Sequence, residues 1–257
     1  MFDFSKDLAA IRLRRPLVHN ITNYVVMNST ANALLAMGAS PVMAHAKQEV
    51  EELASAASSV VLNMGTLSES WIHSMVLAAR AAAKAGVPIV VDPVGVGATQ
   101  FRAKTILELL SSCSPAIIRG NSSEIMATAE LYLGLPNSSR TKGVDAMVHS
   151  VQAVDMAVQL SRKSGAVVVV SGVVDYIVSG EDVLENHYGT TLMSRVTGMG
   201  CTSSAVCGAF VAVNANHAQA ALHAMQFMGI CGERVFAKVG SAPGSFQVAL
   251  LDEFFTV

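Results

Sequence analysis

The chain has 257 residues, of which 52% are hydrophobic and 14% charged, and its formal net charge is −2. This length fits one large domain with a substantial buried core. The sequence has no basic run, which disfavours nucleic acid and anionic membrane surfaces as partners. Mean hydropathy is high, at +0.46, yet every apolar run is interrupted before the roughly 20 residues that a membrane span needs.

The first predicted elements alternate between helices and short apolar strands. In chain order, the pattern predicts helices over 3–13, 28–37 and 48–57, a strand over 59–64, a helix over 70–85, a strand over 87–92, a helix over 99–110, a strand over 116–119 and a helix over 122–133. The nearly continuous apolar character of these strands is typical of a parallel sheet.

A polar segment, 134–145, follows and is predicted to be a loop. The remaining prediction is a helix over 151–163, a strand over 166–170, edge strands over 176–179 and 183–188, and helices over 202–213 and 217–235. The alternation predicts an α/β fold with a mostly parallel central sheet and helices on both faces, forming a single domain over residues 1–257.

The cysteines and the first residues bear on the cellular compartment. The four cysteines form neither a C-x-x-C pair nor a zinc-type cluster, and residues 1–15 carry charges throughout, unlike a signal peptide. We therefore expect a cytoplasmic protein.

Polar or glycine residues follow four predicted strands, at the edge of the sheet where α/β proteins bind ligands. The four strand ends are 63–65, 92–93, 119–121 and 171–172. One such end is ordinary turn chemistry. Four of them, together with a glycine turn at 198–200, indicate a binding site.

The segment 196–205 places Gly198 and Gly200 just before a helix of small residues. Free amides at a helix start attract anions, so this layout suits an enzyme that binds a phosphoryl group. Cys201 lies beside these amides. It can serve as a base or relay with a thiol pKa lowered by the helix, as a covalent nucleophile, or as an inert buried side chain.

Two acidic residues are candidates for a metal site. Asp92 ends a strand, where a carboxylate can hold Mg²⁺ through water, or can simply order a loop. Glu124 stands three residues after Asn121, which is the spacing of a capping box, and it can also share a Mg²⁺–phosphate site with Asp92.

Arg119 and Ser171 are the candidates for contact with a nucleotide. A guanidinium at a strand end can clamp phosphate oxygens, although a structural ion pair is the plainer alternative. Ser171 can meet nucleotide phosphates or belong to an ordinary turn. The sequence has no G-x-x-x-x-G-K-[ST] motif, so an ATP site here would be of another type.

Six segments together resemble the hydroxyethylthiazole kinases, the thiamine-salvage members of the ribokinase-like superfamily. The similarity covers nearly the whole chain, and its first two segments are specific to these kinases. The segments are 16–25, 38–43, 63–67, 91–98, 119–124 and 196–201.

The resemblance implies transfer of the γ-phosphate of ATP to the hydroxyl of 4-methyl-5-(2-hydroxyethyl)thiazole. It implies that Met43 and Gly198 contact the thiazole, and that Asn23 lines the same pocket. It also implies a homotrimer with thiazole pockets between subunits.

For the other substrate, the resemblance implies that Arg119 and Ser171 contact ATP, while Asp92 and Glu124 organise Mg²⁺. The amides of 198–201, shaped by Gly198 and Gly200, would stabilise charge on the transferring phosphoryl group.

The sequence departs from the expected pattern at two positions, Cys201 and Met199, and Met199 stands where threonine is expected. Cys201 stands where ribokinase-like enzymes usually carry an aspartate base, as it does in many thiazole kinases. Two alternatives stay open on sequence alone. One is a ribokinase-like NAD(P)H-hydrate dehydratase, a lyase, and the other is a non-catalytic nucleotide-binding relative.

Overall fold

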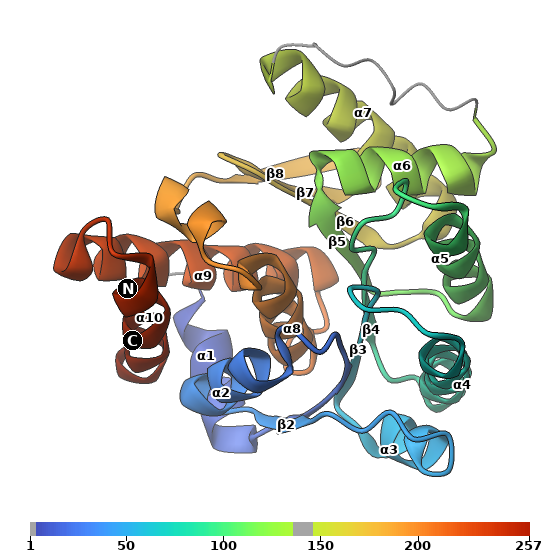
Figure 1. Ribbon diagram of the computed structural model, residues 1–257, viewed down its shortest axis with the longest axis horizontal. Coiled ribbons are helices and arrows are strands. Elements are labelled where there is room, and N and C mark those ends of the chain that lie inside the picture. The colour runs from blue at the N-terminus through green and yellow to red at the C-terminus, as the bar shows by residue number, and fades with distance from the viewer. Residues whose placement is uncertain (1–3, 136–145) are drawn as a thin grey trace.

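The computed structural model describes residues 4–135 and 146–257. In this part of the chain eight strands form one sheet in the order β2-β1-β3-β4-β5-β6-β7-β8 (Figure 1). The pairs from β2 through to β6 are parallel, whereas β7 pairs antiparallel with both β6 and β8. The strands are β1 Leu17–Ile21, β2 Ser40–Val42, β3 Ser59–Asn63, β4 Ile89–Asp92, β5 Ile117–Asn121, β6 Val167–Ser171, β7 Asp175–Ser179 and β8 Asp182–Asn186.

Helices cover both faces of the sheet, as the sequence predicts (Figure 1). On one face lie α1 Ser5–Arg14, α2 Met27–Met37, α8 Met199–Val211, α9 His217–Val239 and α10 Pro243–Thr256, together with the short 3-10 helix η1 Thr191–Arg195. On the other face lie α3 Val50–Ala56, α4 Glu69–Ala85, α5 Gln100–Ser112, α6 Ser122–Leu133 and α7 Ala146–Ser164.

The apolar strands follow from this two-sided burial. Along β6, Val167 and Val169 pack into the core on one face, while Val168 and Val170 pack into the core on the other. Because successive side chains of a strand point to opposite faces, a strand covered on both sides buries every side chain and is therefore mostly apolar. The α/β class is therefore confirmed.

Local sequence signals set the ends of several helices. Ser68 begins α4 by accepting a hydrogen bond from the Trp71 amide at 3.2 Å, and Gly86 ends it in the left-handed region at φ 71°. These are ordinary preferences for small polar N-caps and glycine C-caps. Predicted and observed bounds agree closely for α4 and α5.

Four observed elements have no counterpart among the predicted ones: β1, β2, η1 and α10. In β1, His19 and Asn20 interrupt the apolar pattern, yet both side chains are buried in the structure. In α10, Pro243 and Gly244 look like loop residues, although proline fits the first turn of a helix well. The observed α8 also begins at Met199 rather than Thr202.

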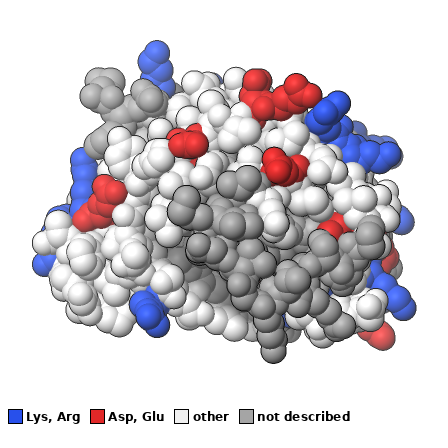
Figure 2. All heavy atoms as spheres, turned by 90° about the horizontal axis from the view of Figure 1, so that it is seen from above, with Lys and Arg blue, Asp and Glu red and all other residues white. Residues whose placement is uncertain are grey.

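Most of the predicted loop 134–145 lies outside the described residues, and Gly134 ends α6. No helix in the described part of the chain is long and apolar enough to cross a membrane. Most of the described surface in Figure 2 is neither acidic nor basic, in keeping with the low charge of the chain.

Candidate active site

A buried polar network lies at the carboxyl ends of β3 and β4. Asn63 and Asp92 are register partners on these strands, and Asn63 Nδ2 donates to Asp92 Oδ2 at 2.6 Å. Asn23 Nδ2 donates to Asn63 Oδ1 at 2.8 Å, and Ser204 Oγ donates to Asp92 Oδ2 at 2.8 Å. The network therefore joins the segment after β1, two central strands and α8.

Asp92 is the charged centre of this network. Burial raises its pKa to about 6, although the nearby Arg119 charge and the hydrogen bonds from Ser204 and Asn63 favour the ionised form. A carboxylate with this pKa ionises near neutral pH. Binding of a cation would favour that ionisation further.

Cys201 lies in the first turn of α8, where Asn23 Nδ2 donates to its Sγ at 3.4 Å. Burial, reinforced by the negative charge of Asp92, raises the pKa of the thiol. This direction is opposite to the lowered pKa that the base or relay interpretation assumes, and it agrees with the interpretation of Cys201 as a buried, unreactive side chain. The protonated thiol is the favoured form, which argues against the nucleophile and base roles.

Gly198 and Gly200, at the start of α8, require glycine for different structural reasons. Gly198 has φ 84°, and a Cβ there would lie 2.5 Å from Val26 Cγ1. Gly200 lies inside the helix, and a Cβ there would lie 2.7 Å from Arg119 Nη1. Gly198 therefore makes the turn, whereas Gly200 leaves room for a guanidinium.

Arg119 reaches α8 from the middle of β5, because the strand continues to Asn121 rather than ending at residue 119 as the sequence predicts, and the residue is 8% exposed. Its Nη2 donates to Ser171 Oγ at 2.7 Å, and Ser171 Oγ in turn donates to the Gly120 carbonyl at 3.2 Å. Arg119 Nε is buried and has no hydrogen-bond partner among the described residues. Because buried donors are normally paired, this nitrogen is a donor for which the described part of the chain supplies no acceptor.

Glu124 forms the capping box that its spacing predicts. Its amide donates to Asn121 Oδ1, and its Oε2 accepts from the Asn121 amide, both at 2.9 Å. Its Oε1 accepts from the Gly95 amide at 2.9 Å. Each carboxylate oxygen keeps a further lone pair, so capping is compatible with contact to a hydrated cation.

The donor set fits Mg²⁺ better than a transition metal. Within residues 4–135 and 146–257 there is no group of three or more His, Cys, Asp or Glu side chains that could hold a metal ion. Mg²⁺ commonly binds through one or two carboxylates, with water and substrate phosphates supplying the other oxygens. Asp92 and Glu124 are close enough for the charge of Glu124 to raise the pKa of Asp92.

Met43 is set apart from this network. It follows β2, so β1 and β3 lie between its strand and the strand of Asp92. The residue after Met43 is held by His19 of β1, whose Nε2 lies 2.7 Å from the Ala44 carbonyl oxygen. Burial lowers the pKa of His19, so the neutral imidazole donates this bond. Of the predicted substrate-binding residues, Asn23 joins the network and Met43 does not.

Asn63 and Ser204 are site residues that the sequence predictions did not include. Asn63 was only part of a strand end, although the parallel register places it opposite Asp92. Ser204 stands three residues after Cys201, one helical turn further along α8.

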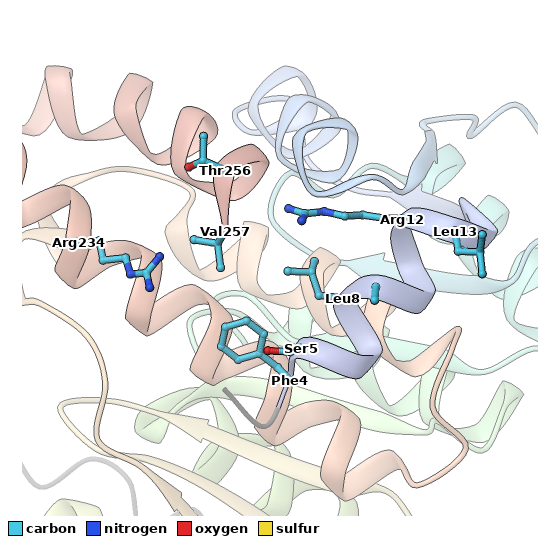
Figure 3. Close-up of a pocket in the computed structure, with 9 residues that line it drawn as sticks. Phe4, Ser5, Leu8, Arg12, Leu13, Arg234, Thr256 and Val257 are labelled. Carbon is cyan, nitrogen blue, oxygen red and sulfur yellow. The ribbon is translucent and has the colours of Figure 1, made fainter. Parts of the chain in front are cut away.

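A separate pocket lies between α1 and the end of α10 (Figure 3). Arg12 lines it and donates through Nη2 to the carbonyls of Phe254 and Phe255, at 3.1 Å each. These bonds satisfy carbonyls at a helix end. None of its lining residues belongs to the network around Asp92.

Comparison with solved structures places this architecture in the ribokinase-like class. A ribokinase-like superfamily protein from Enterococcus faecalis V583 is 14% identical and has a TM-score of 0.62, covering 93% of this chain and 86% of its own. At this identity the likeness is one of fold.

The sequence model of the hydroxyethylthiazole kinase family matches residues 8–257. The hydroxyethylthiazole kinase of Leptospira biflexa serovar Patoc is 52% identical over 250 residues, which cover 97% of this chain and 91% of the relative. The structure of hydroxyethylthiazole kinase from Pyrococcus horikoshii OT3 is 42% identical with a TM-score of 0.90, covering 100% of this chain and 94% of its own.

The chain therefore belongs to the hydroxyethylthiazole kinase family, and it is a kinase. The family resemblance, the ribokinase-like fold and the kinase function predicted from the sequence are all confirmed. The same matches argue against the lyase and the non-catalytic alternatives.

Proposed function

We propose that the enzyme transfers the γ-phosphate of ATP to the primary hydroxyl of 4-methyl-5-(2-hydroxyethyl)thiazole, a step of thiamine salvage that yields the thiazole phosphate and ADP. The observation that carries this proposal is the pairing of Arg119 with the start of α8. Arg119 is buried against Gly200, and its Nε lacks a partner among the described residues. The acceptor is inferred from the relatives, which are hydroxyethylthiazole kinases.

The start of α8 is suited to stabilise the transferring phosphoryl group. The Thr202 amide donates to the Gly198 carbonyl at 2.8 Å, so the amides of residues 199–201 precede the first helical hydrogen bond. Donors fixed in advance around developing negative charge lower the barrier of phosphoryl transfer. Arg119 adds a full positive charge on the side of Ser171, where ATP is expected to lie.

Asp92 and Glu124 would hold Mg²⁺, chiefly through water, on the side of the site facing the ATP phosphates. When bound, the ion would neutralise phosphate charge. Asn63 and Ser204 keep Asp92 in place through hydrogen bonds of 2.6 and 2.8 Å. Glu124 is fixed by the amides of Asn121 and Gly95.

The thiazole would lie against Asn23, Met43 and Gly198, with its hydroxyl near Cys201. Asn23 links this pocket to the phosphoryl site because it donates to both Asn63 and Cys201. A protonated Cys201 would position the hydroxyl, since phosphoryl transfer depends mainly on alignment and charge stabilisation.

We assign the enzyme a homotrimeric state with sites between subunits. Tyr24 and Val25 support this assignment, because they adjoin Asn23 and are 67% and 64% exposed in the isolated chain. Apolar side chains beside a substrate pocket are suited to contact with a second copy. Light scattering after size exclusion would test the assignment, and a monomeric active enzyme would contradict it.

We further assign the chain a single kinase domain over residues 1–257 and a place in the cytoplasm. The single sheet supports the first assignment. Unpaired cysteines support the second, since Cys113, Cys201, Cys207 and Cys231 are all free thiols.

The test of the reaction is release of ADP from Mg²⁺·ATP by the purified enzyme, with and without the thiazole alcohol. Thiazole-dependent ADP together with a phosphorylated thiazole in the mass spectrum is the expected result. Arg119→Met should lose this activity, whereas the surface variant Lys163→Met should keep it. ATP binding without thiazole-dependent turnover would contradict the proposed substrate.

A further inference from the structure

Arg102 joins two loops beside the site. This residue lies in the first turn of α5, where its amide donates to the N-cap Thr99 Oγ1 at 3.2 Å. Its Nη1 donates to the Val94 carbonyl at 2.6 Å and also to the Met64 carbonyl. Its Nη2 donates to the Gly65 carbonyl at 2.8 Å. One guanidinium thus binds three carbonyls, two after β3 and one after β4.

The loop after β3 adjoins the polar network. The Gly65 amide donates to Asn63 Oδ1 at 2.9 Å, and this same oxygen accepts from Asn23. A Cβ on Gly65 would lie 2.4 Å from Asn23 Nδ2, so the loop packs directly on Asn23. Because Arg102 binds the Gly65 carbonyl, it fixes the residue on which Asn23 packs.

The loop after β4 connects the two acidic residues. The Val94 amide donates to the Asp92 carbonyl at 2.9 Å, and the Gly95 amide donates to Glu124 Oε1 at 2.9 Å. Arg102 binds the Val94 carbonyl, which belongs to the same peptide unit as the Gly95 amide. This peptide unit is therefore held at its oxygen by Arg102 and at its nitrogen by Glu124.

Only arginine suits this position. Its guanidinium offers five donors in a rigid plane, whereas lysine offers three donors from one point. The glycine at 95 has φ 67°, and a Cβ there would touch Arg102 Nε and Nη1 at 3.5 Å. The loop thus passes close over the guanidinium.

We propose that Arg102 is a positioning residue for phosphoryl transfer. It keeps the loops after β3 and β4 in one arrangement, so that Asp92 and Glu124 face a common Mg²⁺·ATP. The inference rests on the proposed function in assigning these two carboxylates to Mg²⁺. Arg102 itself acts through the Val94–Gly95 peptide and does not touch the substrate.

The test compares Arg102→Ala with the wild type in kcat, in the KM for the thiazole and in Mg²⁺ activation. Since a displacement of catalytic groups by about 1 Å can lower the rate 10²-fold, kcat should fall by roughly 10- to 100-fold. The KM for the thiazole should stay within about twofold of the wild-type value. The Mg²⁺ concentration for half-activation should rise. Arg162→Ala is the matched control, because Arg162 forms an exposed ion pair with Glu181. It should behave like the wild type.

Chemical rescue separates positioning from general destabilisation. Methylguanidinium at tens of millimolar should restore kcat of Arg102→Ala several-fold, with sodium chloride as the ionic-strength control. A wild-type kcat and Mg²⁺ activation would overturn the inference. A loss of kcat without rescue, in proportion to a loss of folded protein, would overturn it as well. If Arg102→Ala does not fold, Arg102→Lys decides: an intermediate kcat supports the inference, and a wild-type kcat overturns it.

Asp92→Ala keeps this result distinct from a failure of the proposed function. A wild-type enzyme that produces no thiazole-dependent ADP contradicts the proposed reaction. Unchanged Mg²⁺ activation in Asp92→Ala contradicts the metal assignment. The inference on Arg102 fails by itself when Asp92→Ala is impaired in Mg²⁺ activation and Arg102→Ala is not.

Discussion

The guanidinium of Arg119 occupies the space that a side chain at Gly200 would fill, with Nη1 only 2.7 Å from the position of such a Cβ. Helix α8 therefore contains a glycine in its first turn although glycine is a poor helix former. The helix gives up some intrinsic stability at this point. In return, a buried positive charge lies directly beside its free amides.

Gly200→Ala should separate stability from activity. Alanine favours the helix by about 0.5–1 kcal/mol over glycine, and the atom it meets is the end of a side chain. The protein should therefore stay folded, while Arg119 moves away from the amides and from Ser171. We expect kcat to fall by about 10²-fold, because phosphoryl transfer tolerates little misplacement.

Gly244→Ala is the matched control for this variant. Gly244 also lies in the first turn of a helix, α10, and a Cβ there meets nothing within 4 Å. Thermal unfolding and steady-state kinetics of both variants provide the comparison. Wild-type kinetics in Gly200→Ala would contradict the role given to Arg119.

The sequence predicts the site better than it predicts the contacts within it. Asp92 and Ser171 end parallel strands and Arg119 lies two residues before the end of another, and such strand ends meet at one edge of a sheet. The contacts of these residues with one another and with α8 depend instead on how α8 packs against the sheet, and no short sequence pattern predicts that packing. For this reason the sequence indicates a turn at Gly200 but not the guanidinium that packs there, and it leaves the role of Cys201 open among three alternatives.

The missed strand β1 has a similar physical cause. His19 and Asn20 are polar, so the segment lacks the apolar pattern of a buried strand. In the folded chain His19 binds the Ala44 carbonyl and Asn20 Nδ2 donates to the Val18 carbonyl at 3.0 Å. A buried polar residue is tolerated once it finds such partners, and these become evident only in three dimensions.

Asp92→Asn should stabilise the enzyme without ligands at neutral pH. Burial raises the pKa of Asp92 from 3.8 to about 6, so ionisation opposes folding. The contribution of Asp92 to the stability of the wild type is most favourable below pH 4, where the side chain is protonated in both the folded and the unfolded state. This contribution is lost as pH rises through about 6. By linkage, the full difference amounts to about 3 kcal/mol above pH 6.

The measurement is urea unfolding of the wild type and Asp92→Asn at pH 5 and pH 8. Asparagine keeps an oxygen that can accept from Asn63 and Ser204, which limits other effects of the substitution. The stability gain should be large at pH 8 and smaller at pH 5, while kinase activity is lost. An equal gain at both values would show that the ionisation of Asp92 does not oppose folding.

Glu124→Gln and Asn121→Ala should separate helix capping from metal binding. Asn121→Ala removes the cap of α6 and should cost about 1 kcal/mol of stability, with Mg²⁺ activation retained. Glu124→Gln removes the negative charge and should raise the Mg²⁺ concentration for half-activation. Titration of kcat with Mg²⁺ distinguishes the two variants. If Glu124→Gln leaves the titration unchanged, Glu124 only caps the helix and holds Gly95.

Cys201→Ala should keep kcat within about tenfold of the wild type. General-base catalysis is typically worth 10²–10⁴-fold, and the raised pKa of the Cys201 thiol disfavours the thiolate that a base would need. Cys201→Asp should retain or raise activity, because it supplies a carboxylate at the position of the usual ribokinase-like base. The measurement is kcat for both variants. A loss beyond 100-fold in Cys201→Ala would assign the proton transfer to this thiol despite its burial beside Asp92.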